Sequence, residues 1–221
     1  MIDLGESIRT IQESRYLVKL RDAFVENKSL PEPQTEDEKM LKFVYGGHKW
    51  GGSIRWKESI CLYAICKKCK NFLEIGQLHG VSTRLFGLMA KENNGKVVSI
   101  DPKPYDHNEN DFKMLGVSDY IQTIKESTPW INLKQNWEFD AIFIDGDHSF
   151  ITVLVDYHCF NYYLKQSGFI AFHDTGIREV SDAIYEIKKR DKIEYLYGIE
   201  RLQVFRKTAL PKETYFQRIR K

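Results

Sequence analysis

The chain has 221 residues, of which 42% are hydrophobic and 13% aromatic, so it can bury the core of one domain plus some additions. Its 33 lysines and arginines nearly balance its 31 aspartates and glutamates, so the overall charge does not favour a nucleic acid partner. No apolar run is long enough to span a bilayer, and the first residues lack the pattern of a signal peptide. We therefore expect a cytoplasmic protein whose partners include no nucleic acid and no membrane.

The cysteines agree with that location. Cys66 and Cys69 have the spacing of a redox or zinc pair, but no second pair follows that could complete a zinc site. The pair also closes a helical pattern, whereas a redox pair would open one. We expect all the cysteines to be ordinary reduced thiols.

Residues 1–52 are expected to form a separate helical section that caps the rest of the chain. Apolar spacing predicts a helix over 7–26, and a capping box at Thr35 and Glu38 predicts the start of a second helix. The glycine-rich segment 46–52 is either a plain connector or a lid over a pocket. Dimerisation through these helices is a further hypothesis.

Residues 53–221 alternate apolar strand patterns with helical patterns. Strands are expected over 72–75, 96–100, 120–124, 139–144 and 168–172, with two more inside 193–207 and Gly198 in the bend between them. Helices are expected over 53–70, 82–91, 111–116, 129–135, 151–165 and 178–189. This alternation predicts an α/β fold. We expect a Rossmann-like, doubly wound, mostly parallel seven-stranded sheet with an antiparallel C-terminal strand, plus the N-terminal helices.

The stretch from Phe72 to Phe86 has the order strand, glycine turn, helix. Gly76 and Gly80 lie in the turn, where a side chain would block a ligand from the backbone. The following helix presents free N–H groups and the positive end of its dipole to that ligand. Such turns bind nucleotide-like cofactors.

Acidic side chains and a histidine stand near the carboxyl ends of the expected strands, where ligands bind in such sheets. These residues are Glu74, Asp101, Asp145, His173 and Asp174. A carboxylate at Asp101 can accept both hydroxyls of a ribose, as expected for either NAD or S-adenosylmethionine. A dinucleotide fingerprint needs further glycines where this chain has Leu78 and Val81. The pattern therefore favours S-adenosylmethionine, a cation without phosphates.

A second polar cluster follows the fourth and fifth strands. Asp145 and Asp174, with His173, could converge on a divalent cation such as Mg²⁺, which prefers oxygen ligands. A cation there could orient an acceptor hydroxyl and lower its pKa. His148 is then a candidate general base. The alternative is that Asp147 and His148 only cap the following helix.

Taken together, these motifs resemble the class I S-adenosylmethionine-dependent methyltransferases. The matching segments are Glu74–Thr83, Ser99–Asp101, Phe139–Ser149 and Gly168–Asp174. Within the class they look most like the group often labelled methyltransferase 24. Its relatives include macrolide-sugar O-methyltransferases, cephalosporin-hydroxylase-like proteins and, more distantly, catechol O-methyltransferase.

The resemblance implies a role for each matching residue. The cofactor-binding residues would be Glu74, Gly76, Gln77, Gly80, Ser82, Thr83, Asp101, Ser127 and Asp145. Asp101 would hold the ribose, and Ser127 would lie near the adenine. Asp145, His173 and Asp174 would be the metal ligands, and His148 and Asp145 the catalytic residues.

We therefore expect a methyltransferase that acts on a hydroxyl of a small molecule or a sugar, with the need for a metal left open. Two alternatives stay open at this point. One is an oxidoreductase with an NAD-type cofactor, and the other is a binding protein that keeps the fold without catalysis.

Overall fold

The computed structural model describes residues 8, 10, 15, 16, 18, 19, 31–46, 54–128, 131, 133 and 137–209. Most of the expected helix over 7–26 and nearly all of the 46–52 loop lie outside the described residues. Of the helix expected over 129–135, only Ile131 and Leu133 are described, and both are buried in backbone that is not helical.

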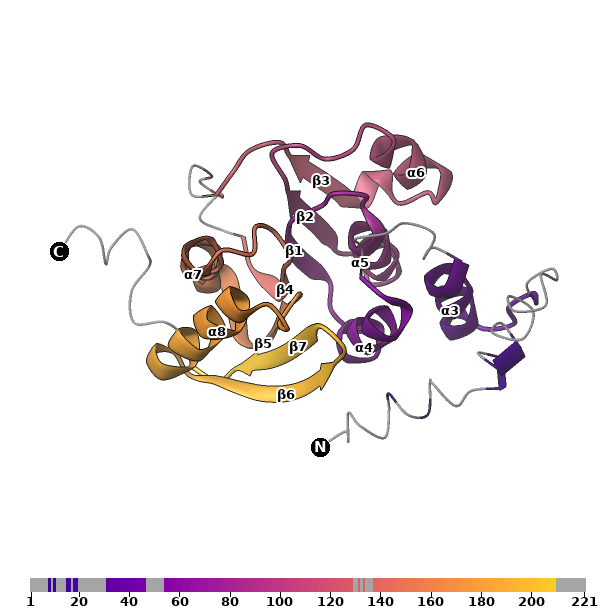
Figure 1. Ribbon diagram of the computed structural model, residues 1–221. Helices are drawn as coiled ribbons and strands as arrows, with labels where there is room; N and C mark the ends of the chain where they lie inside the picture. Colours follow the sequence, from indigo (N-terminus) through magenta and orange to yellow (C-terminus); the bar gives the residue numbers. More distant parts are fainter. Residues whose placement is uncertain are drawn as a thin grey trace.

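The described residues form alternating strands and helices (Figure 1). The strands are β1 (Asn71–Ile75), β2 (Lys96–Ile100), β3 (Ile121–Ile124), β4 (Phe139–Ile144), β5 (Leu164–Phe172), β6 (Ile193–Ile199) and β7 (Leu202–Lys207). The α-helices are α3 (Glu36–Gly46), α4 (Trp56–Cys66), α5 (Val81–Glu92), α6 (Asn108–Met114), α7 (Phe150–Phe160) and α8 (Arg178–Arg190), and short 3₁₀ turns cover Ser118–Tyr120 and Asn161–Tyr163.

All the strands belong to one sheet with the order β3-β2-β1-β4-β5-β7-β6. Neighbours from β3 to β5 pair in parallel, and β7 pairs antiparallel with both β5 and β6. The expected fold class is confirmed, including the antiparallel C-terminal strand. Strand order reverses at β1, which is where open α/β sheets bind their ligands.

Side-chain alternation along the strands builds two hydrophobic layers. Phe72 and Phe143 point to one face and join a cluster with residues of α4 and α5. Ile75 and Ile144 point to the other face and join a cluster with residues of α7 and α8. Figure 1 shows these helix pairs on opposite sides of the sheet. The sheet is therefore buried on both faces, and ligands have access at its carboxyl edge.

The register of the parallel strands aligns their carboxyl ends. Ile75 pairs with Ile100 on one side and with Ile144 on the other, and Ile144 pairs with Phe172. The residues that follow these strand ends therefore meet at one edge of the sheet. This alignment positions the candidate site.

Two local predictions were wrong. The helix expected to run to Lys165 ends at Phe160, and β5 begins at Leu164, because a 3₁₀ turn joins them directly. The bend expected at Gly198 lies instead beyond the end of β6, where Glu200 adopts a φ of +52°. Gly198 itself is paired within β6.

The N-terminal section contributes to the core beside α4 and α5. Ile8, Tyr16, Met40 and Leu41 are buried in the same hydrophobic cluster as those helices. The capping box at α3 forms in part: Thr35 Oγ1 accepts the Glu38 N–H at 3.1 Å, whereas Glu38 Oε2 accepts from Gln34. A domain boundary at residue 52 stays a prediction.

All four cysteines are free thiols and buried. Within the described parts of the chain, no helix combines the length and apolar character needed to cross a membrane.

Candidate active site

A cavity of about 420 Å³ opens at the carboxyl edge of the sheet. Its walls come from the β1–α5 turn, the ends of β2, β3, β4 and β5, and one side of α7. A cavity of this size and place fits a small-molecule ligand.

The turn after β1 depends on Gly76. Its φ is +92°, and a Cβ on it would lie 2.0 Å from the carbonyl oxygen of Asp145. Only glycine therefore lets the turn pass this close to the end of β4. Asp145 donates its N–H to the Ile75 carbonyl at 2.8 Å, which fixes the approach.

Asp101 holds the same turn from the β2 side. Its Oδ2 accepts the N–H groups of Gln77 and Leu78 at 2.9 and 2.8 Å, and its Oδ1 accepts the N–H of Lys103 at 2.7 Å. Leu78 adopts a positive φ of +41°, which these bonds help to stabilise. Oδ2 uses both of its lone pairs on these N–H groups, whereas Oδ1 keeps one. Asp101 lines the cavity and can accept one further hydrogen bond there through Oδ1.

Glu74 is fully buried behind the turn. Its Oε2 accepts the hydroxyls of Thr83 and Ser99, each at 2.5 Å. Its Oε1 is buried and has no hydrogen-bond partner within the described parts of the structure. Burial raises the pKa of this carboxyl to about 7, against the hydroxyls that favour its charged form.

Three side chains converge at the end of the cavity formed by β4 and β5. Nε2 of His148 lies 3.0 Å from Asp174 Oδ2 and 3.9 Å from Asp145 Oδ1. One ligand atom from each of the three residues falls within 4.8 Å of the others. Nε2 is buried without an aligned hydrogen bond to any described residue. This arrangement can receive a proton or a metal ion.

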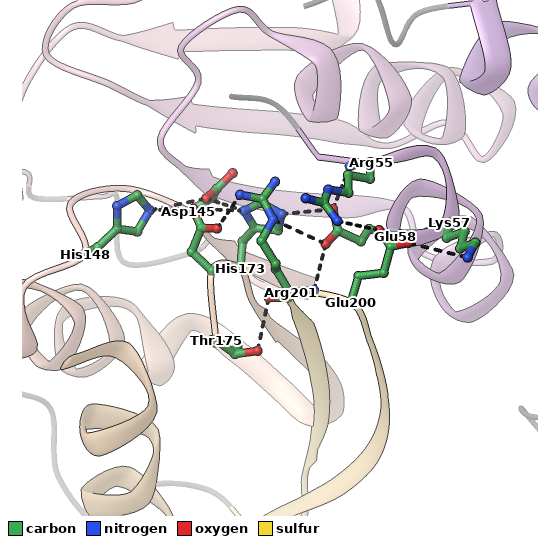
Figure 2. Close-up of polar contacts among 10 residues, drawn as sticks. Arg55, Lys57, Glu58, Asp145, His148, His173, Thr175, Glu200 and Arg201 are labelled. Atoms are coloured by element: carbon green, nitrogen blue, oxygen red, sulfur yellow. Dashed lines mark hydrogen bonds and ion pairs between the residues drawn. The ribbon is translucent and has the colours of Figure 1, made fainter. Parts of the chain in front are cut away.

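His173 is not part of that group. Its side chain is 0% exposed, and its ring nitrogens lie 2.9 Å from Asp145 Oδ1 and 3.0 Å from Glu58 Oε2 (Figure 2). Burial alone would lower the pKa of His173, but the bonds to both carboxylates outweigh it and raise the pKa to about 10. Both ring nitrogens are thus directed at carboxylates of the network, and the expected role of His173 as a metal ligand stays a prediction.

The buried network continues to the β6–β7 turn. Glu58 Oε1 accepts the N–H of Arg201 at 2.9 Å, and the Arg201 guanidinium lies 2.7 Å from Asp174 Oδ1. Figure 2 shows how Arg201 and His173 connect α4 with the ends of β4 and β5. Asp174 itself adopts a positive φ of +51°, a strained conformation that the network holds in place.

Most of the residues expected at the site line one cavity. These residues are Gly76, Gln77, Ser82, Asp101, Ser127, Asp145, His148 and Asp174. Glu74, Gly80, Thr83 and His173 are not part of its wall; Glu74 and His173 lie behind it, and Gly80 is the N-cap residue of α5. The binding role of each of these residues stays a prediction.

Sequence reasoning missed several residues of this region. Glu58 and Arg201 lie far from every motif in the sequence, and their charge made surface positions the ordinary expectation. Thr128 and Asp156 also line the cavity. The spacing of Asp156 within α7 gave no signal of its own.

Gly76 provides a direct test of the turn. We expect Gly76→Ala to destabilise the protein by about 3 kcal/mol or more, because the methyl group meets backbone and the φ is strained. Gly176→Ala is the matched control, since its Cβ would meet nothing within 4 Å and should change stability by less than about 0.5 kcal/mol. Urea unfolding of both variants measures this difference. If Gly76→Ala and Gly176→Ala were equally stable, the close approach of Gly76 to the backbone of Asp145 would be contradicted.

Glu74 predicts a specific pH dependence. The pKa of Glu74 is about 7 in the folded state and 4.5 in the unfolded reference. Between these pH values the folded state retains a proton that the unfolded state has lost. Wild-type stability should therefore fall as pH rises from about 4.5 to about 7, relative to Glu74→Gln, by about 3 kcal/mol in total.

Urea unfolding at pH 5 and pH 8 measures that change. The stability of Glu74→Gln relative to wild type should be higher at pH 8 than at pH 5. For the exposed control Glu92→Gln, at the end of α5, the stability relative to wild type should be the same at both pH values. If the stability difference between Glu74→Gln and wild type were the same at pH 5 and pH 8, the Glu74 carboxyl would not be held in a desolvated site.

Comparison with known proteins agrees with this geometry. Residues 73–175 match the family described as a methyltransferase domain. That segment runs from β1 to the residues just after β5, so it contains the turn, Asp101 and the convergent group. No curated protein matches the chain.

Solved structures share the fold at low identity. An O-methyltransferase from Bacillus cereus, in complex with S-adenosylhomocysteine, has a TM-score of 0.63 at 15% identity, covering 86% of this chain and 97% of that one. PaMTH1 from Podospora anserina, also bound to S-adenosylhomocysteine, has a TM-score of 0.59 at 16% identity, covering 89% and 97%. TomG from Streptomyces achromogenes, an O-methyltransferase of tomaymycin synthesis bound to S-adenosylmethionine, has a TM-score of 0.54 at 14% identity, covering 94% and 96%.

These identities establish a common fold and say nothing about the methyl acceptor. The match of residues 73–175 to a methyltransferase domain favours methyl transfer over the oxidoreductase alternative. Residues 73–175 therefore match a methyltransferase domain, and the chain shares the fold of methyltransferase structures bound to S-adenosylmethionine or S-adenosylhomocysteine.

Proposed function

We propose that the protein transfers the methyl group of S-adenosylmethionine to a hydroxyl of a small molecule or a sugar. The observation that carries this proposal is the convergence of His148, Asp145 and Asp174 at one end of the cavity. A hydroxyl must lose its proton as it attacks a methyl group, and this group offers a proton acceptor with two carboxylates beside it. The O-methyltransferases among the compared structures support the same acceptor chemistry.

The cofactor would lie along the turn between β1 and α5. Asp101 already accepts the N–H groups of that turn, and the remaining lone pair of its Oδ1 would accept a ribose hydroxyl. Ser82, in the first turn of α5, lines the cavity close to Glu74. The unpartnered Oε1 of Glu74 supplies negative potential at the place where the amino group of the methionine part would lie. The charge of this amino group would stabilise the ionised form of a carboxyl that burial otherwise disfavours.

His148 would receive the proton of the acceptor hydroxyl. Its side chain is 41% exposed at the rim of the cavity, although Nε2 itself is buried beside Asp174. Its proximity to Asp145 raises the pKa of the imidazole, against its partial burial. Asp145 and Asp174 would stabilise the imidazolium that forms. Arg201 and His173 hold these two carboxylates from behind and so fix the place of the reaction.

The same residues fit a divalent cation. Two carboxylates and an imidazole are suitable ligands for Mn²⁺ or Mg²⁺. Among the described residues, Arg201 and His173 are the basic groups that contact these carboxylates from behind the cavity. A cation bound there would supply Lewis acidity that lowers the pKa of the acceptor hydroxyl. Asp145 and Asp174 would be the ligands. His148 acts either as the third ligand or as the base, because the same nitrogen cannot do both.

A labelled methyl group tests the proposed reaction. We expect S-adenosylmethionine with a ¹³C methyl group, incubated with catechol, phenol and sugar acceptors, to give a product whose NMR spectrum shows a methyl group on oxygen. Asp174→Asn should lower the rate at least about a hundredfold, whereas the exposed control Asp119→Asn should not change it. Transfer to nitrogen or carbon instead of oxygen would contradict the proposal.

Mn²⁺ binding then separates the two roles of His148. If His148 is the base, His148→Ala should retain Mn²⁺ affinity, measured from the free-ion EPR signal, and lose methyl transfer. If it is a ligand, the variant should lose about tenfold or more in Mn²⁺ affinity. Methyl transfer by wild type that is unaffected by EDTA, together with no Mn²⁺ binding, would exclude the metal-assisted form and leave His148 as the base alone.

A further inference from the structure

Glu58 carries a carboxylate that is fully buried and is not part of the cavity wall. Burying a carboxylate is unfavourable unless protein groups replace the water that it loses. Oε2 of Glu58 accepts the N–H of Arg55 at 2.6 Å and lies 3.0 Å from Nε2 of His173. Its Oε1 accepts the N–H of Arg201 at 2.9 Å. Three polar groups from separate segments of the chain therefore surround this one acid.

The hydrogen bond to Arg55 is an ordinary helix cap. Arg55 is the N-cap residue of α4, and Glu58 is the third residue of that helix, the usual place of an acid in a capping box. An acid can cap a helix in this way at the surface, where it keeps its hydration. The cap therefore does not account for the burial of Glu58, and its contacts with His173 and Arg201 need another reason.

Two arms lead from Glu58 to the carboxylates at the reacting end of the cavity (Figure 2). In one arm, His173 contacts Glu58 through Nε2 and contacts Asp145 Oδ1 through Nδ1 at 2.9 Å. In the other arm, Arg201 donates its N–H to Glu58 and its guanidinium to Asp174 Oδ1 at 2.7 Å. One buried carboxylate thus reaches both acids of the site, each through a single intermediate residue.

The β6–β7 turn has a second attachment that does not involve Glu58. The carbonyl of Arg201 accepts the N–H of Thr175 at 2.9 Å and the hydroxyl of Thr175 at 3.1 Å. This attachment keeps the turn against the end of β5. A change at Glu58 should therefore displace the side chains of the two arms without detaching the turn.

We propose that Glu58 is a positioning residue for methyl transfer, which sets Asp145 through His173 and Asp174 through Arg201. This inference rests on the proposed function, in which the two carboxylates stand beside His148. A small displacement of groups at a reacting centre lowers the rate strongly. None of the hydrogen bonds of Glu58 to described residues reaches the β1–α5 turn. Its loss should therefore slow the reaction without weakening cofactor binding.

Glu58→Gln tests this role, because it keeps the shape of the side chain but sets an NH₂ group against one of the two arms. We expect kcat for methyl transfer to catechol, phenol or sugar acceptors to fall at least about tenfold per folded molecule. The affinity for S-adenosylhomocysteine should stay within about threefold of wild type, because the cofactor site is unchanged. Calorimetry measures this affinity, and its stoichiometry counts the folded molecules.

Glu200→Gln is the matched control, because Glu200 is the neighbour of Arg201 in the same turn. Its carboxylate pairs with Arg55 at 3.5 Å and with Lys57 at 3.6 Å, on the outer side of the network. Losing these partly exposed pairs should change kcat by less than about twofold. If Glu200→Gln and Glu58→Gln lowered kcat equally, the attachment of the turn to α4 would explain the loss and the positioning role would be overturned.

A crystal structure of Glu58→Gln with S-adenosylhomocysteine gives a second result that needs no acceptor. We expect the Asp145 or Asp174 carboxylate to be displaced from its wild-type place. Both carboxylates in their wild-type places, or an unchanged kcat, would overturn the inference. If wild type methylates none of the acceptors, the proposed function fails and the crystal structure still decides the role of Glu58. If Glu58→Gln does not fold, Glu58→Asp replaces it, because its shorter side chain cannot hold both arms.

Discussion

The contact between Gly76 and the backbone of Asp145 is the constraint on which the site depends. It brings the turn after β1 against the end of β4, with no room for a side chain between them. The turn that would cradle the cofactor and the carboxylate beside the reaction are therefore fixed relative to each other by main chain. Asp101 completes the arrangement, because it holds the other side of the same turn. A site built in this way keeps its geometry before any ligand arrives.

A buried network of charged side chains supports the end of the cavity where Asp145, His148 and Asp174 meet. Glu58 on α4 and Asp145 after β4 hold His173 between them, and Arg201 joins Glu58 to Asp174. Breaking one member of such a chain leaves an uncompensated buried charge, which is strongly destabilising. The residues that face the cavity are thus oriented by others that never face it. This explains why Asp174 can be held at a positive φ.

The fold and most of the residues that line the cavity could be predicted from the sequence. Strand patterns located the ends of β1, β2 and β4, and in a parallel sheet those ends share one edge. The surroundings of His173 could not be predicted, because they depend on Glu58, which the tertiary packing of α4 brings beside it. Asp156 was missed for a similar reason: it is one of a few polar positions in α7, and only tertiary packing brings it to the cavity. The cytoplasmic location, the homodimer and the N-terminal boundary stay predictions.

The central claim is that one cavity seats S-adenosylmethionine, with its methyl group at the β4–β5 end. A crystal structure of the protein grown with S-adenosylmethionine tests it most directly. The account predicts the sulfonium methyl beside Asp145, His148 and Asp174, and a ribose hydroxyl on Asp101. A cofactor bound in the reverse direction, or bound outside this cavity, would contradict it.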